Sequence, residues 1–162
     1  MMTNRVFAKS MVQTSGDISQ IVIPVIAFSS TWILDDKEGR FEFTKAFLLN
    51  LGVTYALKVS IDKERPDGGG QAFPSGHTSV AFQGATFIQR RYGWKYGIPA
   101  YLGASYVGWS RVDSRKHDTW DVLAGAAIGM GSSFLFTRPL KNVEVSPIVN
   151  TDAVGLNFTV KW

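Results

Sequence analysis

Cysteine is absent from the 162 residues of this chain, and its absence removes several kinds of chemistry. The protein can form no disulfide bond, no thiolate zinc site and no cysteine nucleophile. Histidine is scarce as well, because His77 and His117 are the only two in the sequence. Any chemistry that needs an imidazole therefore falls on one of these two side chains.

Internal repeats, low-complexity tracts and a clean secretory signal are also missing. Arg5 and Lys9 could form the basic start of a signal peptide, but Asp17 interrupts the approach to the first apolar run. No Ala-x-Ala-like cleavage site follows that run. Two readings stay open: a signal was removed from the mature chain, or the first helix itself acts as an anchor.

The composition is that of a globular chain with room for one domain and a real core. Hydrophobic residues make up 45% of the sequence and charged residues 19%, which is too apolar for a disordered protein. The formal net charge of +4 suits an anionic substrate or an anionic lipid surface. Lysine and arginine do not gather on one periodic face, so nucleic acid is not an expected partner. The oligomeric state is left open.

Four segments without charged residues are long enough for helices but short for membrane spans. They cover residues 18–34, 46–57, 96–110 and 122–137. The longest of them would measure roughly 25 Å as a helix, against about 30 Å for the hydrocarbon core of a bilayer. Each is therefore a short span, a buried core helix, or a helix partly sunk in the membrane. The mean hydropathy of +0.02 is low for a protein built mainly of spans.

The pattern predicts an all-α helical bundle with a short C-terminal β-hairpin. Helices are expected at about 18–34, 41–61, 75–92, 95–112 and 117–136, the first with Asp17 as its N-cap. A Gly/Pro-rich loop fills residues 62–74. The small-residue stretch AGAAIGMG in the last helix would let another helix approach closely. Apolar and polar residues alternate over 143–146 and 154–160, which predicts two strands. We place the helical domain at 1–140 and count the hairpin tail, 141–162, as part of it.

Three clusters carry residues that suit phosphate chemistry. They are Lys58 with Arg65-Pro66, the run Pro74-Ser75-Gly76-His77, and Ser110-Arg111 followed by His117 and Asp121. The two histidines of the chain both fall inside these clusters. Histidines scattered over a surface would have no reason to do so, although each cluster alone is of a common kind.

His117 and Asp121 are four residues apart, which would place them on one face of the last expected helix. A carboxylate beside one imidazole nitrogen fixes the tautomer and leaves the other nitrogen free as a nucleophile. The same carboxylate stabilises the positive ring that forms when the free nitrogen attacks phosphorus. Asp113 and Asp118 are interpreted as solvated loop charges.

The remaining residues suit the binding of a transferring phosphoryl group. Lys58, Arg65 and Arg111 would neutralise its oxygens, a task that otherwise often falls to a metal ion. Ser75 and Gly76 lie at an expected helix N-terminus, where backbone N–H groups favour an anion. His77 lies one residue further on and suits a general acid that protonates the leaving oxygen. No metal and no other cofactor is required.

These residues together resemble the three-part signature of the type 2 phosphatidic acid phosphatase superfamily. That signature reads Lys-x6-Arg-Pro, Pro-Ser-Gly-His and Ser-Arg-x5-His-x3-Asp, and the chain has KVSIDKERP at 58–66, PSGH at 74–77 and SRVDSRKHDTWD at 110–121. The resemblance implies the family's helical bundle and the same roles. His117 would be the nucleophile, His77 the acid and Asp121 the partner of His117.

The resemblance further implies a metal-independent phosphatase that hydrolyses a phosphate monoester or pyrophosphate, of a lipid or of a small molecule, through a phosphohistidine on His117. Soluble periplasmic acid phosphatases, vanadate-dependent haloperoxidases and a non-catalytic envelope protein are the alternatives, and the haloperoxidases are usually much longer chains. We expect an enzyme of the bacterial cell envelope, in the membrane, that acts from the periplasmic side. The sequence does not choose among phosphatidate, phosphatidylglycerol phosphate, isoprenyl pyrophosphate and lipid A.

Overall fold

Five helices form a bundle in the computed structural model, which describes residues 2–140, 143–150 and 153–160 and the side chains of residues 11–140. The helices are α1 (Met2–Ile33), α2 (Lys37–Ile61), α3 (Gly76–Tyr92), α4 (Trp94–Asp113) and α5 (Thr119–Phe136). Two antiparallel strands follow, β1 (Val143–Asn150) and β2 (Ala153–Val160), with Val143 opposite Val160. The predicted helical bundle is confirmed. The placing of the strands in the same domain rests partly on masked residues and stays a prediction.

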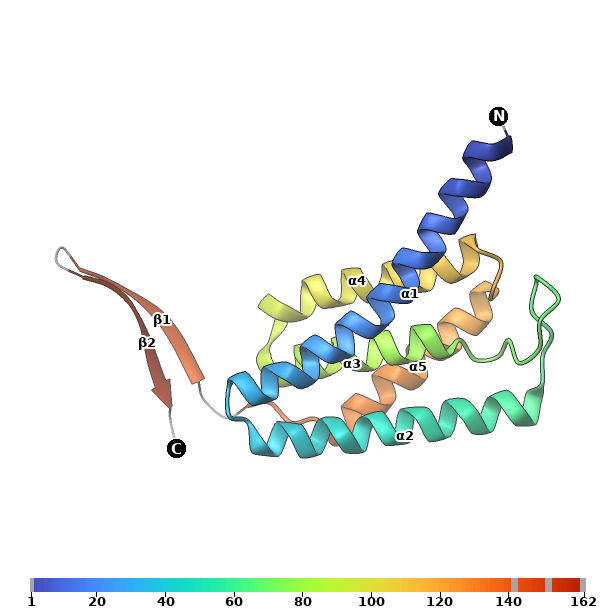
Figure 1. Ribbon diagram of the computed structural model, residues 1–162. Helices are drawn as coiled ribbons and strands as arrows, with labels where there is room; N and C mark the ends of the chain where they lie inside the picture. Colours follow the sequence, from blue (N-terminus) through green and yellow to red (C-terminus); the bar gives the residue numbers. More distant parts are fainter. Residues whose placement is uncertain (1, 141–142, 151–152, 161–162) are drawn as a thin grey trace.

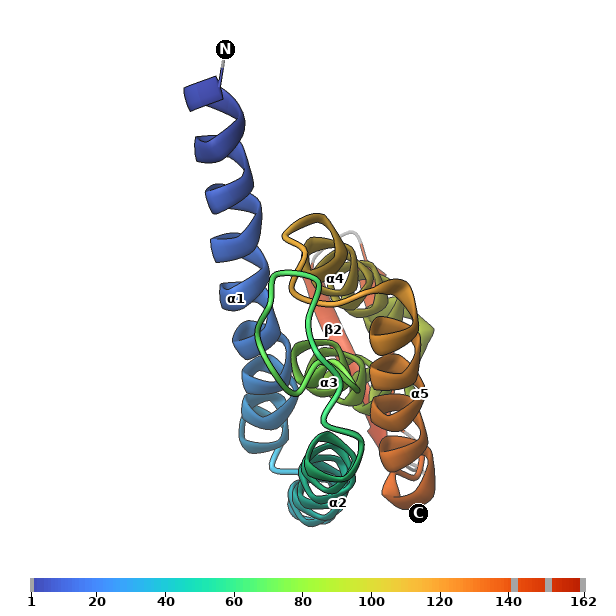
Figure 2. The ribbon, with the colours of Figure 1, turned by 90° about the vertical axis from the view of Figure 1, so that its right-hand side faces the viewer.

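Helix α3 lies at the centre of the bundle and contacts the other four helices (Figures 1 and 2). Small residues allow this close packing. A Cβ atom on Gly84 would come within 3.0 Å of the Pro24 backbone in α1. A Cβ on Gly125 or Gly129 of α5 would collide with the carbonyl oxygens of Ser75 or Ser79. The predicted close approach of another helix to the AGAAIGMG stretch is therefore confirmed, and the partner is α3.

The first helix is longer than the sequence pattern predicts. We expected it to begin after Asp17, but α1 runs from Met2 through Asp17 without a break. Asp17 therefore does not cap the helix, because its side chain instead contacts Arg111 and His77. Within the described residues, the Met11–Ile33 part of α1 is the one segment with the length and apolar composition that a membrane crossing needs.

Polar side chains fill much of the interior, and large apolar side chains cover much of the outside. The buried polar side chains include Asn50, Thr54, Thr78, Ser79, Gln83, Thr86, Ser132 and Ser133. The exposed apolar side chains include Ile18, Val25, Trp32, Leu48, Tyr55, Leu102, Trp109, Leu123 and Leu135. A protein surrounded by water would show the opposite distribution.

A buried ion-pair network closes one end of the bundle. The guanidinium of Arg91 in α3 donates to the carboxylate of Asp36 over 2.7 Å and 2.5 Å and to Glu42 over 3.3 Å. Arg91 Nη1 also donates to the carbonyl oxygen of Arg138 over 3.0 Å. The network joins the α1–α2 turn to the C-terminal ends of α3 and α5. The three sequence clusters lie at the opposite end.

Candidate active site

The three sequence clusters meet at one end of the bundle. Lys58 lies in the last turn of α2, Gly76 begins α3, Arg111 lies in the last turn of α4, and His117 precedes α5. Because these helices alternate in direction, the end of one lies beside the start of the next (Figure 1). The loop between α2 and α3 runs across this end (Figure 2).

His117 lies outside the helix in which the sequence placed it. Helix α5 begins at Thr119, after the N-cap residue Asp118. Asp118 accepts a hydrogen bond from the backbone N–H of Asp121, and Asp121 accepts one from the N–H of Asp118, both over 3.0 Å. This capping box fixes the helix start and leaves His117 in the preceding loop. The interpretation of Asp118 as a solvated loop charge is therefore wrong.

A backbone carbonyl, not a carboxylate, is the hydrogen-bond partner of His117. Its Nδ1 atom lies 2.7 Å from the carbonyl oxygen of Ala72, which only a ring N–H can satisfy. The carboxylate of Asp121 is 3.7 Å from the same nitrogen, within ion-pair distance but beyond a hydrogen bond. No described residue hydrogen-bonds to Nε2. The proton is therefore held on Nδ1, and the lone pair of Nε2 is free.

Burial and two cations keep His117 neutral. Its side chain is 4% exposed. Burial, followed by the positive charge of Lys58 and, more weakly, that of Arg65, lowers the pKa of His117 to about 4, although Ala72 and Asp121 oppose the shift. At neutral pH the ring is uncharged, which is the state that a nucleophile needs.

Lys63, which the sequence analysis missed, anchors Asp121. Its ammonium lies 2.7 Å from Asp121 Oδ1 and 2.5 Å from Asp118 Oδ2. The hydrogen bond from Lys63 holds the pKa of the Asp118 carboxyl below its ordinary value. Asp121 itself is completely buried, so this cation supplies the partner that a buried carboxylate needs.

Two of the three predicted phosphate-binding cations have no carboxylate partner among the residues whose side chains are described. Lys58 Nζ donates to the carbonyl oxygen of Gln71 over 2.7 Å. Among the residues with described side chains, none forms an ion pair or a hydrogen bond with the Arg65 side chain, and its buried Nε atom lacks a partner there. Two cations beside a neutral histidine make a site that attracts an anion.

The third cation, Arg111, is already paired. It is 2% exposed, and its Nη1 donates to Asp17 in α1 over 2.5 Å. Its Nη2 donates to the carbonyl oxygen of Gln13 over 2.9 Å, and its Nε donates to the Ser110 hydroxyl over 3.1 Å. Asp17 is therefore a second residue that the sequence analysis missed. The sequence does contain a signal for Asp17: it is the single charged residue between Lys9 and Asp35, and an isolated charge in an apolar segment indicates a functional residue.

The Pro-Ser-Gly-His run leads into α3, which begins at Gly76. Ser75 is its N-cap, and the completely buried hydroxyl accepts a long hydrogen bond from Thr78 N, 3.4 Å. A Cβ atom on Gly76 would lie 3.6 Å from the Lys58 side chain, so this backbone faces the cation. His77 Nε2 lies 3.2 Å from Asp17 Oδ1. In this structure the Ser75 hydroxyl serves the cap.

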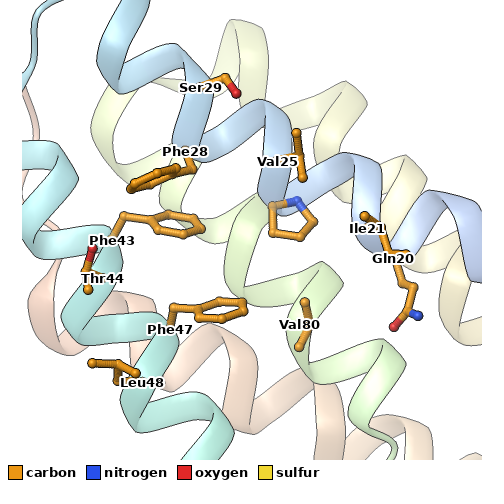
Figure 3. A pocket seen from close by; sticks show the side chains of 11 residues that line it. Gln20, Ile21, Val25, Phe28, Ser29, Phe43, Thr44, Phe47, Leu48 and Val80 are labelled. Atoms are coloured by element: carbon orange, nitrogen blue, oxygen red, sulfur yellow. The ribbon is translucent and has the colours of Figure 1, made fainter.

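A largely apolar groove begins one helical turn away from the site. Its volume is about 460 Å³. Figure 3 shows its lining, from Gln20 and Ile21 at one end to Phe28, Ser29 and Phe43 at the other. Val80, one turn after Gly76 in α3, also lines it. The groove thus extends from the active-site end along α1 and α2.

Within the part of the chain whose side chains are described, no three acidic or histidine side chains form a cluster that could hold a metal ion. The helical fold and the cation-lined histidine site are those expected of a phosphoric ester hydrolase of helical architecture. The family model of the PAP2 superfamily matches residues 41–143. The chain belongs to this superfamily, the type 2 phosphatidic acid phosphatases.

Relatives and solved structures agree with this assignment. The chain is 28% identical to a lipid A 4'-phosphatase of Helicobacter pylori, over 91% of this chain and 83% of the relative. It is 41% identical to a lipid A 1-phosphatase of Porphyromonas gingivalis over 66% of this chain, but it spans 24% of that longer protein.

The solved structures show the same fold. The crystal structure of Aquifex aeolicus LpxE matches with a TM-score of 0.70 at 21% identity, over 80% of this chain and 84% of that one. A transmembrane PAP2-type phosphatidylglycerolphosphate phosphatase from Bacillus subtilis matches with a TM-score of 0.66 at 22% identity, over 80% and 75%.

Proposed function

We propose that this protein is a membrane-embedded lipid phosphatase that removes phosphate through a covalent phosphohistidine on His117, without a metal ion. The observation that carries the proposal is the state of His117. Its Nδ1 proton is held by Ala72, its Nε2 is free, and its neighbours Lys58 and Arg65 have no carboxylate partner among the described residues. A neutral nucleophile beside unpaired cations suits attack on a phosphoryl group.

The first step forms a bond between phosphorus and His117 Nε2 and breaks the bond between phosphorus and the lipid oxygen. Lys58 and Arg65 neutralise the phosphoryl oxygens, and His77 donates a proton to the leaving oxygen. The positive charge that develops on the ring of His117 is stabilised by Asp121, 3.7 Å from Nδ1. Ser75, Gly76 and Arg111 complete the predicted phosphate site.

In the second step water attacks the phosphohistidine. His77, now neutral, accepts a proton from this water, the bond between phosphorus and Nε2 breaks, and inorganic phosphate leaves. The histidine nitrogen returns to its neutral form, so the cycle closes without a metal, an oxidant or a further reactant.

Two features support a lipid substrate. The exterior of the bundle carries large apolar side chains and its interior is polar, a distribution that suits lipid surroundings better than those of a soluble periplasmic acid phosphatase. The apolar groove begins one turn from Gly76 and Asp17, at Val80 and Ile21, so an acyl chain can lie in it while the headgroup phosphate is near His117. The lipid A phosphatases among the relatives make lipid A phosphates the first substrates to test.

We place the enzyme in the envelope of a bacterium with its active site on the periplasmic side. The charged end of the bundle that holds His117 is suited to the headgroup region, while the apolar sides of the helices are suited to the hydrocarbon core. Protease protection of the α2–α3 loop in sealed spheroplasts tests the side of the membrane. Cleavage from outside is expected, and complete protection contradicts the placement.

The decisive experiment measures phosphate release by the detergent-purified protein in the presence of EDTA. Wild type, His117→Ala and the matched control Asp113→Asn are assayed on lipid A phosphates, phosphatidate and phosphatidylglycerol phosphate. We expect release by wild type and control and a loss of at least about 1,000-fold in His117→Ala. Radiolabelled substrate should leave an acid-labile, alkali-stable label on wild type and on the control but not on His117→Ala. A requirement for a divalent metal, or activity that survives in His117→Ala, overturns the proposal.

A further inference from the structure

Asp17 is an acidic residue in the middle of the longest and most membrane-like helix. It is the single charged residue between Lys9 and Asp35. A carboxylate at such a position is costly in lipid surroundings and is retained where it pairs with another group. In this structure it pairs with residues from two other helices, both of which belong to the sequence signature.

One oxygen of Asp17 contacts both signature residues. Asp17 Oδ1 lies 2.5 Å from Arg111 Nη1 and 3.2 Å from His77 Nε2. The Asp17 side chain is 41% exposed and that of His77 37%, so the pair lies at the opening of the site. No described residue forms a hydrogen bond or an ion pair with the other ring nitrogen of His77, Nδ1, which is left free to meet a ligand.

We propose that Asp17 is a positioning residue for the proton donor: it holds Nε2 of His77 and stabilises the protonated ring, so that Nδ1 delivers the proton to the leaving oxygen. This inference rests on the proposed phosphatase function. A carboxylate beside one nitrogen of a histidine favours the charged ring and orients the other nitrogen. When the phosphorus–oxygen bond breaks, the Nδ1 proton moves to the oxygen, and the neutral ring keeps its Nε2 proton beside Asp17.

The charges around His77 show why such a partner is needed. Burial, followed by the positive charge of Arg111 in α4 and, more weakly, that of Arg65 in the α2–α3 loop, lowers the pKa of His77, and Asp17 of α1 is the carboxylate that opposes this shift. Without Asp17, two cations would surround a group that must carry a proton at neutral pH. The signature motifs contain no residue for this task, since Asp121 lies beside His117.

A competing account assigns Asp17 a different role. Its carboxylate oxygen occupies a position between two donors, Arg111 and His77, that a phosphate oxygen could also occupy. On that account Asp17 is a substitute anion that the substrate must displace. The two accounts predict different effects of removing the Asp17 charge. Removal of a substitute anion strengthens phosphate binding, whereas removal of a positioning residue weakens catalysis at higher pH.

The test compares wild type with Asp17→Asn, which keeps the shape of the side chain and removes its charge. Asp113→Asn is the matched control, because Asp113 is an exposed acid at the same end of the bundle. The first readout is the protonation midpoint of His77, followed by NMR of ring-labelled histidine and assigned by its absence in His77→Asn. We expect Asp17→Asn to lower this midpoint by about one pH unit, a tenfold change, and Asp113→Asn to leave it unchanged.

The second readout is the pH profile of kcat. In Asp17→Asn its descending limb, where the proton donor loses its proton, should move to lower pH by the same amount. At pH values above the midpoint of this limb, the variant should be about tenfold less active than wild type. An unchanged His77 midpoint overturns the inference. So does tighter inhibition by inorganic phosphate with an unchanged limb, which identifies a substitute anion. Because the NMR titration needs no turnover, it tests the Asp17–His77 pair separately from the proposed function, which the loss of activity in His117→Ala tests.

Discussion

The Nδ1 atom of His117 donates to the carbonyl oxygen of Ala72 over 2.7 Å. Ala72 is completely buried in the loop between α2 and α3 and belongs to no signature motif. A backbone carbonyl can only accept a hydrogen bond, so this contact fixes the tautomer more strictly than a carboxylate 3.7 Å away. Asp121 is then free to stabilise the charge that develops during attack.

The pH dependence of kcat/KM should show an unusually acidic ascending limb. Burial and the charge of Lys58 lower the pKa of His117 to about 4, and the nucleophile is active only when it is neutral. Activity should therefore persist at pH 5 and fall as the pH drops through about 4, whereas a histidine in water would lose its activity near pH 6.5.

Lys58→Gln provides the control for this assignment. Removal of the cation should lower kcat/KM at all pH values and also move the ascending limb toward higher pH, because the protonated ring of His117 loses a repulsive neighbour. If the ascending limb of the pH profile does not move in Lys58→Gln, a group other than His117 is responsible for its acidic midpoint.

Gly125→Ala should lower activity by disturbing the Pro-Ser-Gly-His turn. The new Cβ atom would collide with the carbonyl oxygen of Ser75, so α5 and the start of α3 must move apart at a cost of about 1–3 kcal/mol. Gly131→Ala in the same helix meets nothing within 4 Å and is the matched control. The unfolding temperature in detergent and kcat on a lipid phosphate should both fall in Gly125→Ala. Both should change little in Gly131→Ala.

Val80→Trp should distinguish lipid from soluble substrates. The larger side chain should fill the groove beside the site, whose lining includes neither His117 nor its cations. We expect KM for a long-chain lipid phosphate to rise about tenfold or more, while kcat/KM for p-nitrophenyl phosphate stays within a factor of two or three. An equal loss on both substrates would mean that the groove does not hold the acyl chain.

Arg91→Met should destabilise the protein without altering its chemistry. The substitution leaves the buried carboxylates of Asp36 and Glu42 without their cation, which costs about 3–5 kcal/mol. The melting temperature should fall clearly, while the protein that stays folded keeps its pH profile, because the network lies at the end of the bundle away from His117. Arg90→Met, which loses long hydrogen bonds to the Thr137 carbonyl and the contact of its guanidinium with the Phe134 ring, should have a much smaller effect.

The ends of the helices show where reasoning from the sequence reaches its limit. The apolar periods and the Gly/Pro-rich loop placed the helices that became α2, α3 and α4 to within a few residues. The start of α1 was wrong because the chain before Asp17 continues as a helix, and the side chain that resembled an N-cap pairs with Arg111, 94 residues later in the chain. The last helix was expected to begin at about His117 but begins at Thr119, because Asp118 and Asp121 form a capping box that fixes its start.

The sequence by itself determined which residues belong to the site, since the spacing of Lys58, Arg65, His77, Arg111, His117 and Asp121 is a property of the chain. It could not determine which atom contacts which. Only the tertiary structure joined His117 to Ala72, Asp121 to Lys63 and His77 to Asp17. Hydrogen bonds and ion pairs act over about 3 Å, and residues far apart in the sequence come this close only when the helices that carry them pack together.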